Sequence, residues 1–277
     1  MREFVYGGVK PLKLSKFLGE KLPELSYRYF RVLLRTKDVK VNGKRTGEDV
    51  LLHGGDRVEV YADEAKLFQF SYTAVYEDDF VLLALKPRGM QSETFARLAA
   101  RKDNLPYRLC HRLDTNTQGI LVLAKTPTAE RAMLAAFKEG RVEKRYLALV
   151  GGEIAAPLKL KHFLLKDAEK GEVRIVDAPT KGALTVLTDV FPIEKREGAT
   201  LVEILLHTGR THQIRAHLAH IGHPVVGDPK YGDYELNRRY RAKFQLLTAY
   251  KIAFRFPADS PLSALDGRQF SISPDFR

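Results

Sequence analysis

The chain has almost no cysteine. Cys110 is the single cysteine among 277 residues. An intramolecular disulfide and a cysteine-rich zinc site both need more than one thiol, so the composition excludes them. This usage is typical of proteins in a reducing compartment, and we expect a cytoplasmic location.

Long apolar runs are also missing. No apolar stretch reaches the roughly 18 residues that a membrane helix needs, and the start MREFVYGGVK has no apolar signal core. Hydrophobic residues make up 44% of the chain and charged residues 29%, the balance of a globular protein. We therefore expect no membrane association.

Acidic residues are too few to balance the basic ones. The chain has 46 Lys and Arg against 34 Asp and Glu, a net charge of +12. Charge alone is weak evidence, because many basic proteins are merely soluble. However, the segment from Lys10 to Arg45 holds eleven Lys and Arg and three Asp and Glu. This concentration favours a polyanionic partner such as nucleic acid.

The basic segment has the pattern of a small domain. The stretch Leu12–Leu22 places apolar residues at helical spacing, and Ser26 is a plausible N-cap for a second helix with an arginine face. VKVNGKR predicts a strand that enters an Asn42-Gly43 turn, and DRVEVY predicts a closing strand. Two helices and a small sheet are therefore expected.

This order of elements, with its VNG turn and GDRVEV ending, resembles the RNA-binding domain named after small-subunit ribosomal protein four (S-four). The resemblance covers Leu12 to Tyr61. The alternative is a generic small domain with a solvated basic face. We expect an S-four-type domain at residues 1–62, a linker at 63–71 and a second domain at 72–277. The resemblance implies RNA contacts from Lys13, Lys16, Arg28, Arg31, Arg35, Lys44 and Arg45.

The second domain mixes strand-like and helical runs without a regular alternation, which favours an α+β fold with a mixed, largely antiparallel sheet. The expected strands are FVLLALKP, ILVLAK, YLALV, ALTVLTDVF, TLVEILL and YKIAFRF. The expected helices are ETFARLAARK, AERAMLAAFKEG and THQIRAHLAHIG.

A polar turn that carries Asp114 leads directly into an apolar strand in CHRLDTNTQGILVLAK, Cys110–Lys125. Such a turn presents a carboxylate on a loop that the sheet holds in place. Without other evidence, an aspartate here is more often a turn-forming residue than a catalytic one.

HRLDTNTQG resembles the HRLDxxTSG signature of the RluA-type pseudouridine synthases, which modify large-subunit ribosomal RNA and some transfer RNAs. Two further segments resemble that family in the same order, KRYLALV (Lys144–Val150) and the run from Thr208 to Gly232. Gln118 departs from the pattern, because the family usually has serine there. The resemblance covers nearly the whole chain and implies an enzyme without a cofactor that acts on RNA, and we expect a monomer.

The resemblance also implies roles for individual residues. Asp114 is the expected catalytic carboxylate and Arg215 its ion-pair partner. Tyr146 is expected to lie against the target base, with its phenol a candidate for removing the C5 proton. Arg112 is expected to enter the RNA stack where the flipped uridine left, and His111 to shape the loop or touch phosphate.

Several alternatives remain open. A binding-only ribosome-assembly factor would not need the three catalytic residues, and an N-glycosylase would release free uracil. Transfer RNA is the alternative substrate. A metal site at His212, His217, His220 and His223 is disfavoured, because their spacing does not repeat the i, i+4 pair of helical zinc sites, and we expect no metal. A Cys110–His111 thiol dyad is disfavoured, because neighbouring side chains in an extended segment point to opposite faces.

Overall fold

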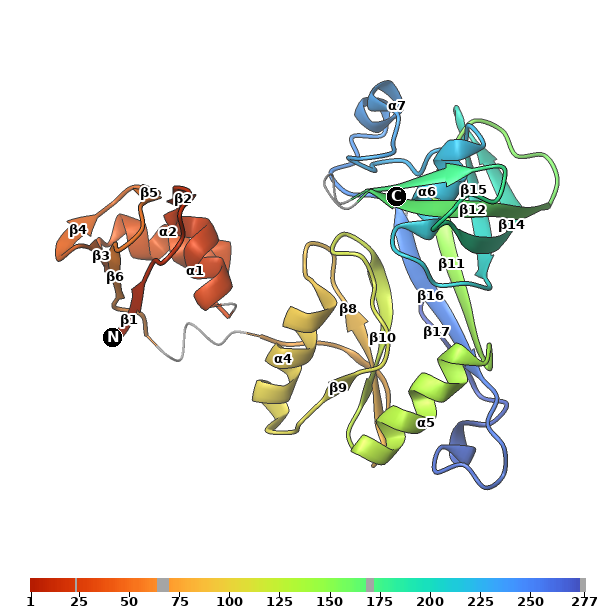
Figure 1. Ribbon diagram of the computed structural model, residues 1–277, viewed down its shortest axis with the longest axis horizontal. Coiled ribbons are helices and arrows are strands. Elements are labelled where there is room, and N and C mark those ends of the chain that lie inside the picture. Colours follow the sequence, from red (N-terminus) through yellow and green to blue (C-terminus); the bar gives the residue numbers. More distant parts are fainter. Residues whose placement is uncertain (23, 64–69, 168–171, 275–277) are drawn as a thin grey trace. The chain divides into compact units, whose positions relative to one another are not determined.

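A computed structural model describes residues 1–22, 24–63, 70–167 and 172–274. The chain forms two compact units (Figure 1), an N-terminal unit of residues 1–71 and 101–103 and a large unit of residues 72–100 and 104–277. Most of the expected linker 63–71 lies outside the described residues. Within the described part of the chain, no helix is long and apolar enough to cross a membrane.

The N-terminal unit combines two helices with a four-stranded antiparallel sheet in the order β1-β6-β3-β4. A second, two-stranded sheet pairs β2 with β5. Its elements are β1 (Arg2–Val5), β2 (Leu12–Lys13), α1 (Leu14–Lys21), α2 (Tyr27–Arg35), β3 (Val39–Val41), β4 (Lys44–Thr46), β5 (Leu51–Leu52) and β6 (Arg57–Val60).

The two expected helices are confirmed, with one correction. Helix α1 begins at Leu14 rather than Leu12, because Leu12 and Lys13 pair with β5 as a short strand. In α2 the Ser26 side chain accepts a hydrogen bond from the Tyr29 amide, which confirms the N-cap. The apolar faces of both helices are buried with the sheet in one core.

The expected hairpin turn between β3 and β4 is present. Asn42 and Gly43 have φ values of 51° and 77°, the left-handed pair that a two-residue turn between twisted strands requires. The Asn42 side chain also accepts from the Arg57 amide and donates to Asp56. The VNG sequence therefore predicts this turn because Asn and Gly tolerate the left-handed backbone and the Asn42 side chain ties the turn to β6.

The large unit is built on one eleven-stranded sheet, and its β10–β16 pairing is parallel while the other described pairings are antiparallel. This confirms the expected α+β class with a mixed, largely antiparallel sheet. The strands are β7 (Ala74–Glu77), β8 (Val81–Lys86), β9 (Arg108–Leu109), β10 (Gln118–Ala124), β11 (Val142–Gly151), β12 (Leu158–Asp167), β13 (Glu172–Val176), β14 (Leu184–Arg196), β15 (Ala199–Leu206), β16 (Leu247–Phe254) and β17 (Gln269–Ser271).

Four α-helices in the described residues of this unit flank the sheet (Figure 1): α4 (Ser92–Asp103), α5 (Pro127–Lys138), α6 (Gln213–His220) and α7 (Tyr234–Arg239). A short 3-10 turn, η1, spans Ser263–Leu265. Helix α5 packs Ala129, Met133 and Ala136 into the core formed with β8, β10 and β16. The sheet and these helices hold the loops that form the cleft described next.

Candidate functional site

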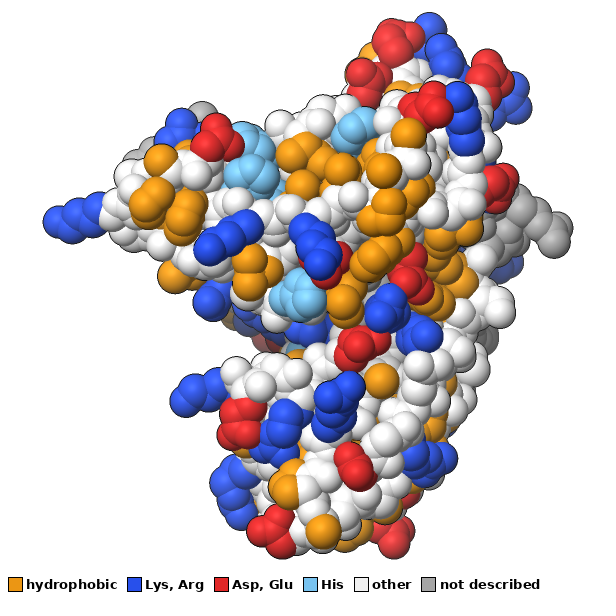
Figure 2. Space-filling model, turned by 90° about the vertical axis from the view of Figure 1, so that its right-hand side faces the viewer, with side chains coloured by type: hydrophobic (Ala, Val, Ile, Leu, Met, Phe, Trp, Pro, Cys, Tyr) orange, Lys and Arg blue, Asp and Glu red, His pale blue; other side chains and the backbone are white. Residues whose placement is uncertain are grey.

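A cleft of about 1080 Å³ opens within the large unit. The loop between β9 and β10, the end of α5, strand β11 and the start of α6 supply its walls. Figure 2 shows one face of the molecule with a hollow whose margins carry Lys and Arg side chains. The cleft lining includes five residues expected from the sequence, His111, Arg112, Asp114, Tyr146 and Arg215.

The loop that carries Asp114 is fixed from several sides. The Thr117 amide donates to the Asp114 carbonyl and closes a tight turn. The Ser92 hydroxyl, at the start of α4, both donates to the Leu113 carbonyl and accepts from its amide, each at 3.0 Å. These bonds leave the loop little freedom, so the Asp114 carboxylate has a defined position at the cleft.

Arg215 links Asp114 to a second carboxylate. Its Nη1 donates to Asp114 Oδ2 at 2.9 Å, while Nε and Nη2 donate to the two oxygens of Asp228 at 2.6 and 2.9 Å. Arg215 and Asp228 are buried, and the Asp114 side chain keeps 25% exposure. The bidentate pair with Asp228 therefore orients the guanidinium, and its remaining nitrogen orients the one carboxylate that solvent and substrate can reach.

Opposite charges in contact shift the pKa values of Arg215 and Asp228. Burial lowers the pKa of Arg215, but the hydrogen bonds and charges of Asp228 and Asp114 outweigh burial and raise it above its usual range. Burial likewise raises the pKa of Asp228, but the hydrogen bond and charge of Arg215 outweigh it, and the net shift is downward. Arg215 and Asp228 therefore both favour their charged forms, as a contact between opposite charges requires.

Tyr146 lies in β11. The pairing of β11 with β16 shifts its register between Arg145 and Tyr146. Tyr146 is 7% exposed and lines the cleft. Burial, followed by the nearby negative charge of Asp114, raises the pKa of Tyr146 far above its ordinary value. The phenol is therefore protonated at neutral pH and can donate a hydrogen bond, and the expected role as a base for the C5 proton stays a prediction.

Arg112 and His111 are neighbours in the chain but differ sharply in exposure and in their contacts. Arg112 projects from the loop with 70% exposure, 3.5 Å from Glu93. The His111 ring packs on Phe137, and its Nε2 accepts from the Val122 amide. Burial and the Lys144 charge lower the pKa of His111 to about 3. A neutral imidazole that accepts a backbone hydrogen bond fits the loop-shaping role rather than a cationic phosphate contact.

Two lysines at the site were not singled out from the sequence. Lys86 ends β8, is fully buried, and donates to the carbonyls of Pro87, Met90 and Thr115 at 2.7–3.1 Å. It thereby ties the end of β8 to the Asp114 loop. Lys144, in β11, lines the cleft, and burial lowers its pKa. A lone lysine closing the apolar run FVLLALK is a signal that could have identified Lys86.

Gln118, the departure from the family pattern, is half-buried at the start of β10 and opposite Thr248 of β16. It is not among the described residues that line the cleft. The next residue, Gly119, has φ +139°, and a Cβ there would lie 2.3 Å from the Ala249 carbonyl oxygen. The turn thus needs glycine at 119 but leaves the Gln118 side chain outside the cleft.

The basic residues expected to contact RNA in the N-terminal unit are all exposed. Helix α2 displays Arg28, Arg31 and Arg35 on its outer side, opposite its buried apolar face. The Arg45 guanidinium donates to the Lys37 carbonyl and lies 5.7 Å from the Tyr61 ring centre. The remaining members of this exposed set are Lys13, Lys16 and Lys44.

The four histidines of the weighed metal set do not converge on a common point. His212 bonds the Tyr231 hydroxyl and His223 bonds the Gly151 carbonyl, whereas His217 and His220 bond other partners. Cys110 is buried, which raises the pKa of its thiol to about 12. The structure therefore supports neither the four-histidine site nor a reactive thiol.

The large unit and its cleft have counterparts in known proteins. The family model described as RNA pseudouridylate synthase matches residues 51–220, more than half of the chain. This match includes Asp114, Tyr146 and Arg215 and ends before Asp228.

Curated relatives match over most of their length. Ribosomal large subunit pseudouridine synthase C of Vibrio cholerae is 33% identical, with 89% of this chain and 86% of the relative covered. Its namesake from Buchnera aphidicola is 31% identical, with 88% and 86% covered. The solved structure of Human RNA Pseudouridylate Synthase Domain Containing 1 superposes with a TM-score of 0.62 at 28% identity, covering 74% of this chain and 84% of that one. The chain belongs to the RNA pseudouridylate synthase family, and it is an RNA pseudouridine synthase.

Proposed function

We propose that the protein converts specific uridines of large-subunit ribosomal RNA to pseudouridine, with Asp114 as the catalytic carboxylate. The observation that carries the proposal is the carboxylate held at the cleft by Arg215, 2.9 Å away, on a loop fixed by buried hydrogen bonds. The choice of RNA is supported by the names of the relatives, which are ribosomal large subunit enzymes.

The reaction explains why an ionised carboxylate is needed. The N1–C1′ bond of uridine must break, the uracil must turn, and C5 must bond to C1′ while the C5 proton leaves and N1 takes up a proton. Asp114 can form a covalent intermediate or stabilise the positive charge that develops on the sugar. Arg215, 2.9 Å from the carboxylate, keeps it aimed in either case.

The target base must leave the RNA stack before it can react. The cleft volume of about 1080 Å³ accommodates a nucleotide, since small-molecule sites span roughly 300–1,000 Å³. Exposed Arg112, two residues before Asp114, is suited to fill the gap left in the RNA stack. Its planar guanidinium can stack on bases and also bind phosphate.

Tyr146 is assigned to holding the base. Its buried ring offers a flat surface next to the catalytic loop, and a protonated hydroxyl can donate a hydrogen bond to the uracil. Tyr146 therefore positions the uracil during its rotation.

The N-terminal unit, residues 1–62, is assigned as an S-four-type domain that grips folded RNA. Its exposed arginines and lysines can neutralise several phosphates, and each such contact contributes through release of counterions. With ribosomal RNA as substrate, the protein works in the cytoplasm, as a monomer and without a cofactor.

The substrate is tested by incubating the protein with unmodified large-subunit ribosomal RNA and, separately, unmodified transfer RNA, followed by pseudouridine mapping. Pseudouridine at discrete positions of the ribosomal RNA alone is expected. Modification of transfer RNA alone would make the assigned substrate wrong. Free uracil with abasic sites would indicate an N-glycosylase instead.

A further inference from the structure

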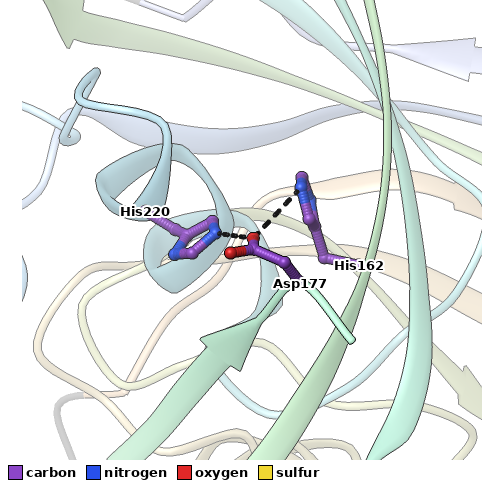
Figure 3. A group of neighbouring side chains, drawn as sticks. All are labelled: His162, Asp177 and His220. Carbon is purple, nitrogen blue, oxygen red and sulfur yellow. Dashed lines mark hydrogen bonds and ion pairs between the residues drawn. The ribbon is translucent and has the colours of Figure 1, made fainter. Parts of the chain in front are cut away.

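Three side chains of the large unit converge away from Asp114. Figure 3 shows His162 on strand β12, Asp177 directly after β13 and His220 at the end of α6, with both imidazoles directed at the carboxylate. His220 Nε2 lies 2.7 Å and His162 Nε2 3.8 Å from Asp177 Oδ1. Within the described ranges, this is the one group of at least three His, Cys, Asp or Glu residues whose ligand atoms all lie within 4.8 Å.

We propose that His162, Asp177 and His220 bind a divalent transition-metal ion of the zinc class. Two imidazoles and one carboxylate form a donor set that suits Zn²⁺ and related ions and does not suit Mg²⁺. Tetrahedral ligands at a Zn²⁺ ion stand about 3.3 Å apart, since each Zn–N or Zn–O bond measures about 2.0–2.1 Å. The observed 2.7 and 3.8 Å fall on either side of that value.

The fold itself brings the three residues together. Strands β12 and β13 are antiparallel with Phe163 opposite Val176, so the next pair in the same register is His162 and Asp177. Helix α6 packs on these strands through Ala216, which joins Leu164, Val173, Ile175 and Val186 in one apolar cluster. The backbone therefore fixes the ligand positions without help from an ion.

A buried hydrogen-bond chain supports His162 from behind. His162 Nδ1 lies 2.7 Å from Nε2 of His217, whose Nδ1 lies 3.0 Å from the Thr188 hydroxyl. With a metal on Nε2, His162 carries its proton on Nδ1 and donates it to His217, which in turn donates to Thr188. Ligating histidines commonly have such an outer partner, which sets the tautomer and the ring orientation.

The site is open to solvent on the carboxylate side. The Asp177 side chain is 80% exposed, and His220 is 28% exposed. An ion can therefore enter from water, and a water molecule can complete a fourth position. The ion would join β12 and β13 to the end of α6, the helix that also carries Arg215, so it would brace the scaffold of the active site without taking part in the chemistry.

The test uses the untagged full-length chain, stripped with a chelator and titrated with Zn²⁺ by calorimetry. One Zn²⁺ per chain is expected, together with a raised Tm, because an ion that binds only the folded state stabilises it. Millimolar Mg²⁺ should not compete. His220→Ala and Asp177→Ala should each weaken binding more than about 100-fold, beyond the roughly 10- to 100-fold typical for losing an outer partner.

His207→Ala is the matched control. His207 lies 2.9 Å from Asp189 in a similar half-exposed pair, and neither residue belongs to the three-ligand group. This variant should bind Zn²⁺ like the wild type. Asp177→Ala alters a side chain so exposed that the fold should be retained, and its circular dichroism checks this. Absence of saturable binding, or binding that is equal in all variants, would overturn the proposal.

Discussion

Arg215 is the residue on which the geometry of the site depends. It is buried, and it divides its donors between Asp228, which is inaccessible, and Asp114, which faces the cleft. If Asp228 is altered, the guanidinium loses the partner that fixes its plane. The position of Asp114 then loses its support, although Asp114 itself is unchanged.

Asp228→Asn is expected to lower both stability and activity. Breaking a buried ion pair costs about 3–5 kcal/mol, which corresponds to a fall in Tm of roughly 6–20 °C for a domain of this size. A scanning fluorimetry melt measures the effect. Glu235→Gln is the control, since its pair with Arg238 at 2.8 Å is about 70% exposed on both sides. A change in Tm of similar size in both variants would contradict the assigned role of Asp228.

Lys86 couples the catalytic loop to pH. Burial lowers the pKa of Lys86 to about 8, an effect that the Asp114 charge partly opposes. As the pH rises through this value, the ammonium loses one of the three N–H donors that serve three carbonyl groups. The loop is therefore held less firmly above about pH 8 than below it.

We expect kcat to decline as the pH rises above about 8, and Lys86→Met to lack this part of the pH profile. The variant should also lose about 10- to 100-fold in kcat at pH 7, because a small displacement of a catalytic group is costly. Single-turnover rates from pH 6 to 9.5 test this. An alkaline decline that is identical in both proteins would assign the titration to another group.

The sequence identified Asp114, Tyr146 and Arg215 as a group through the family resemblance, and the structure places all three at one cleft. The sequence analysis assigned no role to Asp228, Lys86 or Lys144. Asp228 acts through the Arg215 side chain, and Lys86 reaches the Thr115 carbonyl 29 residues away, and local sequence shows neither contact. Their catalytic roles stay predictions until variants are measured.

At the scale of elements, the junction of β10 with β16 is a tightly constrained point near the site. Their pairing is parallel and covers Gln118–Thr248 and Gly119–Ala249, directly after the Asp114 turn. Because Gly119 combines φ +139° with close backbone contact, no side chain fits there without separating the strands.

Gly119→Ala should therefore destabilise the protein by about 3 kcal/mol or more, since the added methyl group meets backbone atoms. Gly182→Ala is the control, because Gly182 also has positive φ (+82°) but has open space around its Cβ position. It should cost only roughly 1–2 kcal/mol of backbone strain. Urea unfolding of both proteins gives the comparison, and equal losses would contradict the packing argument.

Elements with a continuous apolar run or a clear helical period were predictable. Helices α4, α5 and α6 and strands β8, β10, β11, β14, β15 and β16 match the expected runs closely. Strands β7, β9, β12, β13 and β17 were not among the expected ones, although in β12 Lys159 and Lys161 alternate with apolar residues as in a half-buried strand. Helix α7 buries no residue, so it has no apolar face for a pattern to reveal. Strands β9 and β17 have only two and three residues, too few for a pattern.

At the scale of the whole molecule, the net charge of +12 and its concentration in the N-terminal unit predict salt-dependent RNA binding. Replacing Arg28, Arg31 and Arg35 by glutamine in the full chain should make the dependence of log K on log salt shallower by roughly 2–3. Filter binding to folded ribosomal RNA at several salt concentrations measures this slope.

Lys195→Gln with Arg238→Gln serves as the control, because both residues are exposed on the large unit outside the cleft lining. This double variant should change the slope by less than about 1. An unchanged slope in the triple arginine variant would count against an RNA-gripping role for the N-terminal unit.

The most direct test of the account follows tritium release from 5-tritiated uridine in unmodified large-subunit ribosomal RNA, with wild type and Asp114→Asn compared. Asparagine keeps the shape of the side chain and removes its charge. We predict release and pseudouridine formation by the wild type, a loss of at least about 1000-fold in the variant, and similar RNA affinity in both. Release by Asp114→Asn at the wild-type rate would contradict the assignment of the catalytic carboxylate.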